Sequence, residues 1–377
     1  MNKSRVAVIR CDGYEEQSVM KAVTAGISLL GGVSAFAAPD ERILLKPNVL
    51  VGEEPEKVIS PHPLVVRALA GVFRHRTSRL TYGDSPGFGK PQAGLRKAGL
   101  AAAAEEFGAQ PADFTNGREV SFPDSPFTKR FRLAEGALAC DGMVSIAKLK
   151  SHAFMRMTGA VKNQFGCIPG MSKASFHLKL QDAKDFGGML AALTLCLKPR
   201  LYVMDGIVAM EGNGPRNGNP RRMNVLLFST DPVALDSVMC RLASLDPALL
   251  PTNLPGRRWG LGTFLEEEIE IVGDDLHPLV NGDFSVNRAR ARRQIPPGAG
   301  FIVSNFVAPR PVIDERLCTR CGTCVQVCPV TPKAVDWRDA SRSRPPKHFY
   351  DRCIRCYCCQ ELCPEKAISV RRGLFGS

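Results

Sequence analysis

The sequence predicts an α/β domain with a mostly parallel sheet and flanking helices, followed by a small α+β domain. Two observations support this prediction. Short, nearly continuous apolar runs alternate with amphipathic segments over the first 300 residues, which is the pattern of parallel strands buried between helices. The composition then changes after Val286, and the last part of the chain holds nine of the fourteen cysteines, eight of them in two copies of one motif.

The predicted elements of the first domain follow one another in a regular order. Short apolar runs predict strands at 5–10, 42–51, 79–83, 142–147, 200–205 and 225–229. Segments with helical periodicity predict helices at 15–30, 63–74, 92–107, 185–197 and 232–243. Strands that alternate with helices are joined by crossover connections, so we expect neighbouring strands to run parallel.

The boundary between the two domains is predicted at residue 300. A run rich in arginine leads into the segment QIPPGAG at 294–300, and Pro309 and Pro311 follow. Proline and glycine at this density are typical of a connector. We therefore expect an α/β domain at 1–300 and a second domain at 301–377.

The second domain contains two copies of one cysteine motif, C-x2-C-x2-C-x3-C-P. The first copy begins at Cys318 and the second at Cys353, and each cysteine of the first maps onto the second by adding 35. This spacing is typical of bacterial ferredoxins with two [4Fe–4S] clusters, in which the fourth cysteine of each motif binds the other cluster. The predicted ligands of one cluster are Cys318, Cys321, Cys324 and Cys363, and those of the other are Cys353, Cys356, Cys359 and Cys328.

Zinc and disulfide bonds are the alternatives to clusters. Zinc sites usually combine two pairs of cysteine or histidine and do not repeat this run. Disulfide bonds suit secreted chains with a signal peptide, and the apolar segment at 22–39 begins too late and contains too many glycines to be one. Cys358 interrupts the second motif, and we interpret it as a thiol beside the cluster or as an alternative ligand during assembly.

The formal net charge is +13. Two oxidised clusters with their thiolates would carry about −2 each and offset part of it. The arginines at 288, 290, 292 and 293 form either a solvated linker face or a docking patch for an acidic redox partner. No nucleic-acid module accompanies the charge, and no stretch has the length of a membrane span. We expect a cytoplasmic protein that binds no nucleic acid, whereas the sequence does not indicate its oligomeric state.

Polar residues follow several predicted strands of the first domain, where α/β proteins bind ligands. Lys46 and Asn48 end the second strand, Asp84 ends the third, and Asp205 ends the strand at 200–205. A lysine at the end of a buried strand needs an anionic partner, so we expect one for Lys46. Asp231 precedes a helix directly, and we expect it to cap that helix.

The segment at 148–170 has the highest density of cations in this domain. It contains Lys148, Lys150, His152, Lys162 and Asn163 among small residues. Cations in a half-buried segment indicate a carboxylate or phosphate ligand. His152 is a candidate proton donor, with a satisfied structural histidine as the alternative. Cys167, in the same segment, is expected to be a buried thiol rather than a ligand or nucleophile.

Several of these segments together resemble the family numbered 362 among domains of unknown function. The matching segments are LKPN at 45–48, GDSPG at 83–87, KLKSH at 148–152, TGAVKN at 158–163, FG at 165–166, DG at 205–206 and DPVALD at 231–236. The resemblance spans about residues 5–275, and many relatives also carry a ferredoxin tail. It implies the architecture given above and supplies no established reaction.

The sequence therefore predicts an iron–sulfur protein that transfers electrons through two [4Fe–4S] clusters. We expect a redox enzyme that acts on a small anionic substrate bound in the α/β domain. The predicted catalytic residues are His152, Lys162 and Lys46, and the predicted substrate-binding residues are Lys148, Lys150, Asn163, Asn48 and Asp84. The alternatives are a ferredoxin-like carrier or adaptor that docks a redox partner, and a non-redox enzyme whose clusters are structural or sense redox state.

Overall fold

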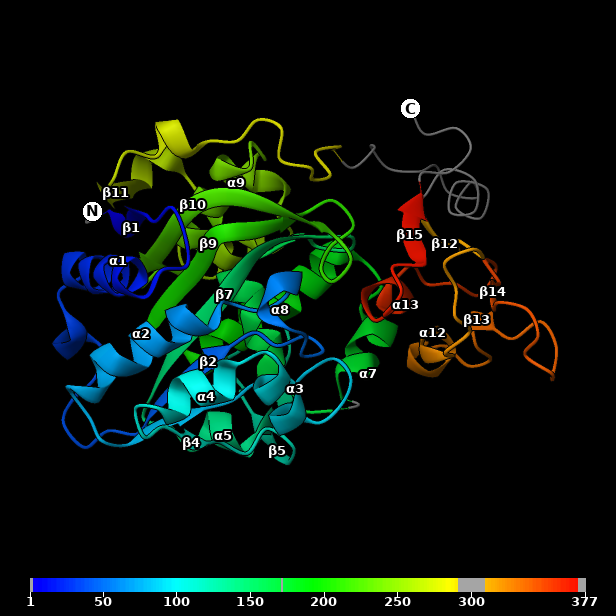
Figure 1. Cartoon of the computed structure of the whole chain (residues 1–377), viewed down its shortest axis with the longest axis horizontal. Coiled ribbons are helices and arrows are strands. Elements are labelled where there is room, and N and C mark those ends of the chain that lie inside the picture. The colour runs from blue at the N-terminus through cyan, green and yellow to red at the C-terminus, as the bar shows by residue number, and fades with distance from the viewer. Residues whose placement is uncertain (1–2, 171, 291–308, 372–377) are drawn as a thin grey trace.

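A computed structural model describes residues 3–170, 172–290 and 309–371. Its centre is a nine-stranded sheet with helices on both faces (Figure 1). The strand order is β11-β1-β10-β9-β7-β2-β3-β4, and β8 pairs with β7 at one end. Among these strands only β10 and β8 run antiparallel to their neighbours. The predicted α/β fold with a mostly parallel sheet is confirmed.

The elements have the following bounds. The strands of the large sheet are β1 (Ser4–Arg10), β2 (Ile43–Pro47), β3 (Leu80–Tyr82), β4 (Gln110–Pro111), β7 (Gly142–His152), β8 (Arg156–Thr158), β9 (Leu201–Glu211), β10 (Asn219–Ser229) and β11 (Ile269–Gly273). A separate hairpin pairs β5 (Gly117–Ser121) with β6 (Arg130–Ala134). The helices are α1 (Glu16–Leu29), α2 (Pro63–Arg74), α3 (Pro91–Lys97), α4 (Leu100–Glu105), α5 (Glu135–Leu138), α6 (Ala160–Asn163), α7 (Ser172–Lys179), α8 (Ala183–Leu197), α9 (Pro232–Leu242) and α10 (Asn253–Arg258).

Five predicted elements differ from the structure. The strand predicted at 42–51 ends at Pro47, and the strand predicted at 225–229 begins at Asn219. The strand predicted to end at Asp205 continues to Glu211, so Asp205 lies inside β9 rather than at its end. The strand predicted at 142–147 continues through Lys148 and Lys150 to His152. The helix predicted at 92–107 is two helices, because Gly99 between them adopts a φ of 70°, which few other residues tolerate.

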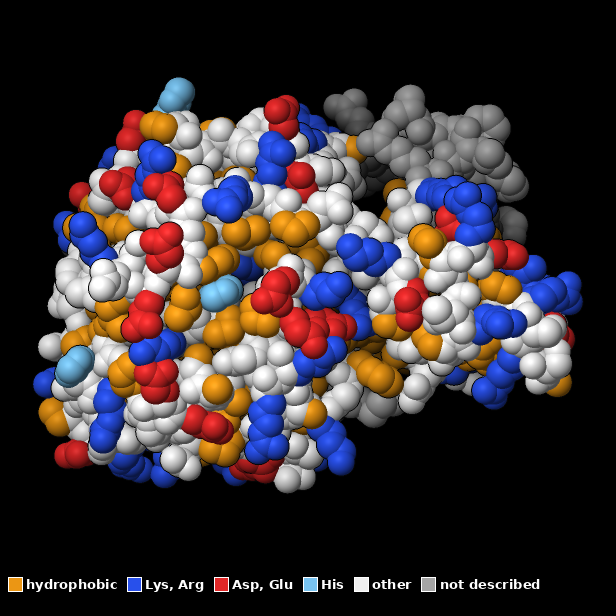
Figure 2. Space-filling model, viewed as in Figure 1, with side chains coloured by type: hydrophobic (Ala, Val, Ile, Leu, Met, Phe, Trp, Pro, Cys, Tyr) orange, Lys and Arg blue, Asp and Glu red, His pale blue; other side chains and the backbone are white. Residues whose placement is uncertain are grey.

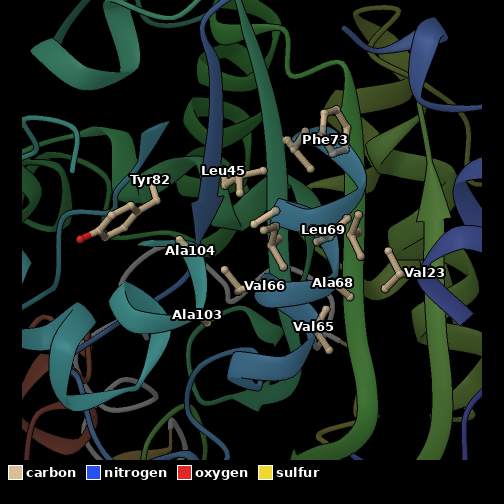
Figure 3. Close-up of a cluster of buried hydrophobic side chains, with 14 of the residues drawn as sticks. Val23, Leu45, Val65, Val66, Ala68, Leu69, Phe73, Tyr82, Ala103 and Ala104 are labelled. Atoms are coloured by element: carbon tan, nitrogen blue, oxygen red, sulfur yellow. The ribbon is translucent and has the colours of Figure 1, made fainter. Parts of the chain in front are cut away.

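The helix α2 shows how the core holds the sheet and its outer layer together. Its apolar stripe, which includes Val65, Leu69 and Phe73, packs with Leu45 of β2 and with Val23 of α1 (Figure 3). Each fully buried side chain of this size contributes roughly 1.5–3 kcal/mol relative to an exposed one. On the opposite face, α6 and α9 contact the same sheet, and α8 packs against α6. The sheet is therefore buried on both sides, as its continuous apolar strands require.

The C-terminal module is small and mixes short strands with short helices. β12 (Arg310–Ile313) pairs with β15 (Ile368–Arg371), and β13 (Val335–Asp336) pairs with β14 (Lys347–His348). Two short helices, α12 (Thr323–Val327) and α13 (Cys358–Glu361), contact each other. The predicted domain boundary at 300/301, Arg292 and Arg293 lie outside the described residues.

The module contacts the α/β domain through α13 and the loop between β9 and β10 (Figure 1). Gln360 Nε2 donates to the backbone oxygen of Asn213, at 3.0 Å, and to its side-chain oxygen, at 2.9 Å. Asn217 Nδ2 donates in return to the backbone oxygens of Gln360 and Cys363, at 3.1 and 3.2 Å. Arg216 adds a bond of 2.7 Å to the backbone oxygen of Leu362. These bonds fix α13 against the end of the sheet.

Candidate functional site

The cysteines of the two motifs line two separate cavities of the module. Each cavity is formed by three cysteines of one motif and the fourth cysteine of the other, which is the grouping that the sequence predicts. One is lined by Cys318, Cys321, Cys324 and Cys363, and the other by Cys353, Cys356, Cys359 and Cys328. The two cavities have similar volumes, about 340 and 310 Å³. We call them the first and the second cavity.

The sulfurs surround these spaces rather than meeting at one point. Among the residues that the structure describes, no three His, Cys, Asp or Glu side chains come close enough to bind a single metal ion. A soft thiolate set spread around a cavity suits a polynuclear iron–sulfur centre. His348 lies beside the second cavity, with Nε2 at 3.4 Å from the sulfur of Cys359.

A buried polar cluster lies at the ends of β2 and β3 in the α/β domain. The Lys46 ammonium donates to Asp84 Oδ1 at 2.7 Å and to Asn163 Oδ1 at 3.1 Å, and the Lys46 and Asp84 side chains are at most 4% exposed. The other oxygen of Asp84 accepts the backbone N–H of Val49 at 2.8 Å. The anionic partner predicted for Lys46 is therefore Asp84 of the same chain.

Gly166 is necessary for this cluster. A Cβ atom at this position would lie 1.8 Å from Asp84 Oδ1 and 2.8 Å from the Lys46 ammonium. Only glycine lets the turn after α6 approach the ion pair so closely.

A second buried cluster involves Lys148 of β7 and Asp205 of β9, which are opposite each other in the sheet. The Lys148 ammonium donates to Asp205 Oδ2 at 2.8 Å and to the Tyr14 hydroxyl at 2.7 Å, and that hydroxyl donates to Asp205 Oδ1 at 2.8 Å. Asn48 accepts the backbone N–H of Lys148 at 3.1 Å. Both the lysine and the carboxylate are thus paired inside the protein, and Asn48 joins β2 to β7.

The third group lies where β7 meets the C-terminal module. His152 ends β7, and its Nε2 lies 3.1 Å from Oε1 of Glu361 in α13. Both side chains are buried, at 1% and 11% exposed. Lys150 lies two residues before His152 on β7, and its ammonium donates to the backbone oxygen of Ile59 at 2.6 Å. Lys162 of α6 is half-buried beside them.

The electrostatics of this group follow from burial and from the lysines. Burial, aided by Lys162 and Lys150, lowers the pKa of His152 well below its usual range, so the imidazole is neutral. Burial and the charge of Lys162 lower the pKa of Lys150 to about 7. Burial also lowers the pKa of Lys162, although the carboxylate of Glu361 opposes this shift. The same burial raises the pKa of Glu361 to about 7.

Aromatic side chains lie next to His152 and Lys162. His177 of α7 is buried and stacks on Phe186, with ring centroids 4.7 Å apart. Phe154 and Phe165 contact the same histidine ring, at centroid distances of 6.1 and 5.9 Å. Burial lowers the pKa of His177 to about 3. This side of the group is therefore apolar and holds a neutral imidazole.

The structure thus divides the predicted site residues into three groups. Lys46, Asp84 and Asn163 form one group, Lys148 and Asn48 a second, and His152, Lys150 and Lys162 a third. The first two groups are internally neutralised, whereas the third faces the C-terminal module. Asp231 caps α9 through Val233 and Ala234, as expected. Cys167 is fully buried, and burial raises the pKa of its thiol to about 12.

Sequence reasoning missed four contributors to these groups: Glu361, Lys173, His177 and Tyr14. Lys173 donates to the backbone oxygens of Ser85 and Pro86 at 2.7 and 3.0 Å. The available signal for Glu361 was its position between Cys359 and Cys363, which places it in the cysteine-rich segment. Its contact with β7 depends on how the module docks onto the α/β domain, and no local sequence pattern predicts this docking.

Comparisons with known proteins support both parts of this description. Residues 43–241 match the domain of unknown function DUF362, and residues 310–364 match a 4Fe-4S dicluster domain. The chain is 37% identical over 257 residues to a thylakoid-associated protein of Synechocystis sp., an alignment that covers 68% of this chain and 79% of that protein. No helix in the described part of the chain combines the length and apolar character needed to cross a membrane.

Two further similarities concern parts of the chain. A ferredoxin of Pyrobaculum islandicum is 37% identical over 60 residues, which are 16% of this chain and 51% of that ferredoxin. The lactate racemase apoprotein of Thermoanaerobacterium thermosaccharolyticum superposes with a TM-score of 0.39 and 11% identity, over 61% of this chain and 55% of that one. The dicluster domain and the ferredoxin similarity identify an iron–sulfur protein of the electron-transfer type. The chain belongs to the family defined by the domain of unknown function DUF362.

Proposed function

We propose that this protein is an iron–sulfur oxidoreductase that reduces or oxidises a small anionic substrate at the end of β7. One observation supports this proposal above the others. Helix α13 carries Cys359 of the second cavity, and two residues later the same helix places Glu361 against His152. One short helix therefore carries a cysteine of the second cavity and contacts the group of His152, Lys150 and Lys162.

The cysteine sets fit two [4Fe–4S] clusters. We assign the four cysteines of the first cavity to one cluster and the four of the second cavity to the other. When bound, such clusters supply one-electron transfer at potentials that depend on hydrogen bonds to sulfur, nearby charge and solvent exposure. Each cavity has two buried cysteines, and the exposed cysteine, Cys321, belongs to the first. We assign exchange with an external partner to the first cavity for this reason, and exchange with the substrate to the second, because its Cys359 lies on the helix that contacts His152.

The surface of the module supports an anionic redox partner. Arg316 precedes the first motif, Arg320 lies within it, and both are exposed. Lys and Arg side chains cover much of the C-terminal lobe in the view of Figure 2. Positive charge around an exposed centre accelerates the approach of an acidic partner.

The protein's own residues have distinct proposed roles. Lys162 and Lys150 attract the substrate anion, and His152 holds its Nε2 proton toward the reacting position. The pairs of Lys46 with Asp84 and Lys148 with Asp205 fix the strand ends that carry this group. Lys46, which the sequence predicts to be catalytic, thus has a positioning role in this proposal. Its ammonium already pairs with the Asp84 carboxylate, at 2.7 Å.

The carrier or adaptor alternative receives less support from the arginine run. Arg288 donates to the backbone oxygens of Ser244, Ala243, Gly282 and Phe284, at 2.7 to 3.2 Å. Its guanidinium therefore anchors the end of the α/β domain rather than forming a docking patch. Arg290 pairs with Asp246 at 3.5 Å.

The test is reoxidation of the dithionite-reduced protein by small anions under anaerobic conditions, with cluster spectra followed by EPR. We expect a subset of oxidised small anions to reoxidise the wild type and expect Lys162→Met and His152→Phe to slow this reaction at least about tenfold. The control is Lys21→Met, which removes an exposed lysine of α1. Equal rates in all variants with full iron content would contradict the enzyme proposal and favour the carrier.

A further inference from the structure

Three of the buried polar atoms that lack a hydrogen-bond partner lie in the same place. They are His152 Nε2, His177 Nδ1 and Glu361 Oε1. His177 lies close enough to His152 to help lower the pKa of the His152 imidazole. Native proteins leave few buried polar atoms without partners, and such atoms at a functional site indicate a missing ligand or water.

The hydrogen bonds of His152 fix its tautomer. Its Nδ1 accepts the backbone N–H groups of Phe154 and Met155, at 3.1 and 3.2 Å. An atom that accepts these bonds carries no proton, so the proton of the neutral ring lies on Nε2. Glu361 Oε1 lies 3.1 Å from this nitrogen, yet the two atoms are not aligned for a hydrogen bond. His152 therefore keeps a free hydrogen-bond donor beside the position of a carboxylate.

The surrounding charges also favour a carboxylate there. Lys162 and Lys150 both lower the pKa of His152 and both interact with Glu361. Asp84 also interacts with Lys150, but its two oxygens are already bonded to Lys46 and to the backbone of Val49. Glu361 thus supplies the carboxylate that balances these lysines, and it comes from the module rather than from the α/β domain.

We propose that Glu361 occupies the binding position of a substrate carboxylate, so that the substrate is a small carboxylic acid that displaces Glu361 when it binds. We call this position, beside His152, Lys150 and Lys162, the carboxylate site. The inference rests on the proposed function and names its substrate class. A substrate carboxylate at this site can accept a hydrogen bond from the Nε2–H group of His152. It lies next to the helix that carries Cys359.

The test measures acetate binding by isothermal titration calorimetry to the cluster-loaded protein. Acetate reproduces the glutamate carboxylate, and acetamide serves as its neutral isostere. Wild-type protein must first release Glu361, which reduces its apparent affinity by the fraction of time that the site is free. Glu361→Ala should therefore bind acetate at least about tenfold more tightly than the wild type. Acetamide should bind neither protein.

Three further variants assign the effect to the site. Glu315→Ala removes an exposed module carboxylate that lines neither cavity, and it should bind acetate as the wild type does. Glu361→Ala combined with Lys162→Met should lose the gain. Glu361→Gln keeps the shape of the side chain and should also bind acetate more tightly, so the test does not depend on the folding of the alanine variant. Iron content reports whether each variant keeps its clusters.

The outcomes separate this inference from the proposed function. If folded Glu361 variants bind acetate no more tightly than the wild type, or if Lys162→Met leaves binding unchanged, the carboxylate site is wrong. If acetate binds as expected but no carboxylic acid exchanges electrons with the clusters, the site stands and the oxidoreductase proposal fails.

Discussion

At the scale of single residues, the ion pair of Lys46 and Asp84 shows how a predicted site residue acquires a structural role. Both side chains are buried, and their charges are matched by each other and by Asn163. A buried pair contributes little net stability, but removal of one partner leaves an unmatched charge in the interior. The pair therefore holds the ends of β2 and β3 only while both members are present.

We predict that Asp84→Asn lowers the free energy of unfolding by about 3–5 kcal/mol, because the Lys46 charge loses its counterion. Urea denaturation monitored by circular dichroism measures this loss. The double variant with Lys46→Met should recover part of it. Glu270→Gln, which breaks the exposed pair with Arg5, is the matched control and should cost less than about 1 kcal/mol. Similar losses for the two acidic variants would contradict the structural role.

His177 predicts a dependence of stability on pH. Its pKa is about 3 in the folded protein and near 6.5 when the chain is unfolded, so the unfolded chain binds a proton first as the pH falls. The contribution to stability is complete above pH 6.5 and is lost progressively toward pH 3. The ring faces Phe186, Phe154 and Phe165, and the nearby titratable groups are Lys162 and His152.

Between pH 6.5 and about 5.5, the free energy of unfolding of the wild type should fall by roughly 1 kcal/mol more than that of His177→Phe. Denaturant titrations of both proteins at a series of pH values measure this difference. Groups remote from His177 that titrate in this range contribute to both proteins and cancel. Parallel stability curves would show that His177 does not remain neutral in the fold.

At the scale of elements, β7 determines what the sequence could and could not predict. Its apolar first half was evident at 142–147, but the second half carries Lys148, Lys150 and His152 and was not predicted as strand. The β9 strand was predicted to end at Asp205 for the same reason, because a buried charge interrupts the apolar pattern. Each charge has a partner on another element, such as Asp205 for Lys148. Pairing across the sheet, rather than local composition, keeps these residues in strands.

Helix α13 should depend on Gln360 for its position. The side-chain nitrogen donates to Asn213 and to the backbone oxygen of Gly214, at 2.9 to 3.3 Å. Gln360→Ala should weaken docking by about 1–3 kcal/mol, because buried acceptors lose their donor. Limited proteolysis should then cleave the chain faster between the domains, while iron content stays unchanged. Gln326→Ala, on the exposed side of α12, is the control and should resemble the wild type.

At the scale of the whole molecule, the cysteine spacing predicted the grouping of thiols across two motifs, because the chemistry of a cluster constrains both the residues and their separation. The contact of Glu361 with His152 joins segments more than 200 residues apart, and no pattern in either segment reports the other. The lysines of the candidate site can be recognised in the sequence. Which of them face a ligand cannot, because that depends on whether a carboxylate from a distant strand already pairs with each lysine.

The two cavities should lose iron independently. Cys321→Ser and Cys356→Ser should each reduce iron from about eight to about four atoms per chain, because each cavity would hold one four-iron cluster. Iron and sulfide quantitation after anaerobic purification measures this change. Cys358→Ser is the neighbouring control, since Cys358 lines neither cavity, and it should keep the wild-type content. Unchanged iron in the first two variants would contradict the assignment.

The docking segment Gln360, Glu361 and Leu362 lies between Cys359 of the second cavity and Cys363 of the first. A cluster in the second cavity would therefore hold one end of this segment, and a cluster in the first cavity would hold the other. In a chain that has not received its metal, the bonds of Gln360, Asn217 and Arg216 alone would hold Glu361 against β7. The spacing of three residues thus links the firmness of domain docking to maturation, so that a chain without its clusters docks more loosely than a complete one.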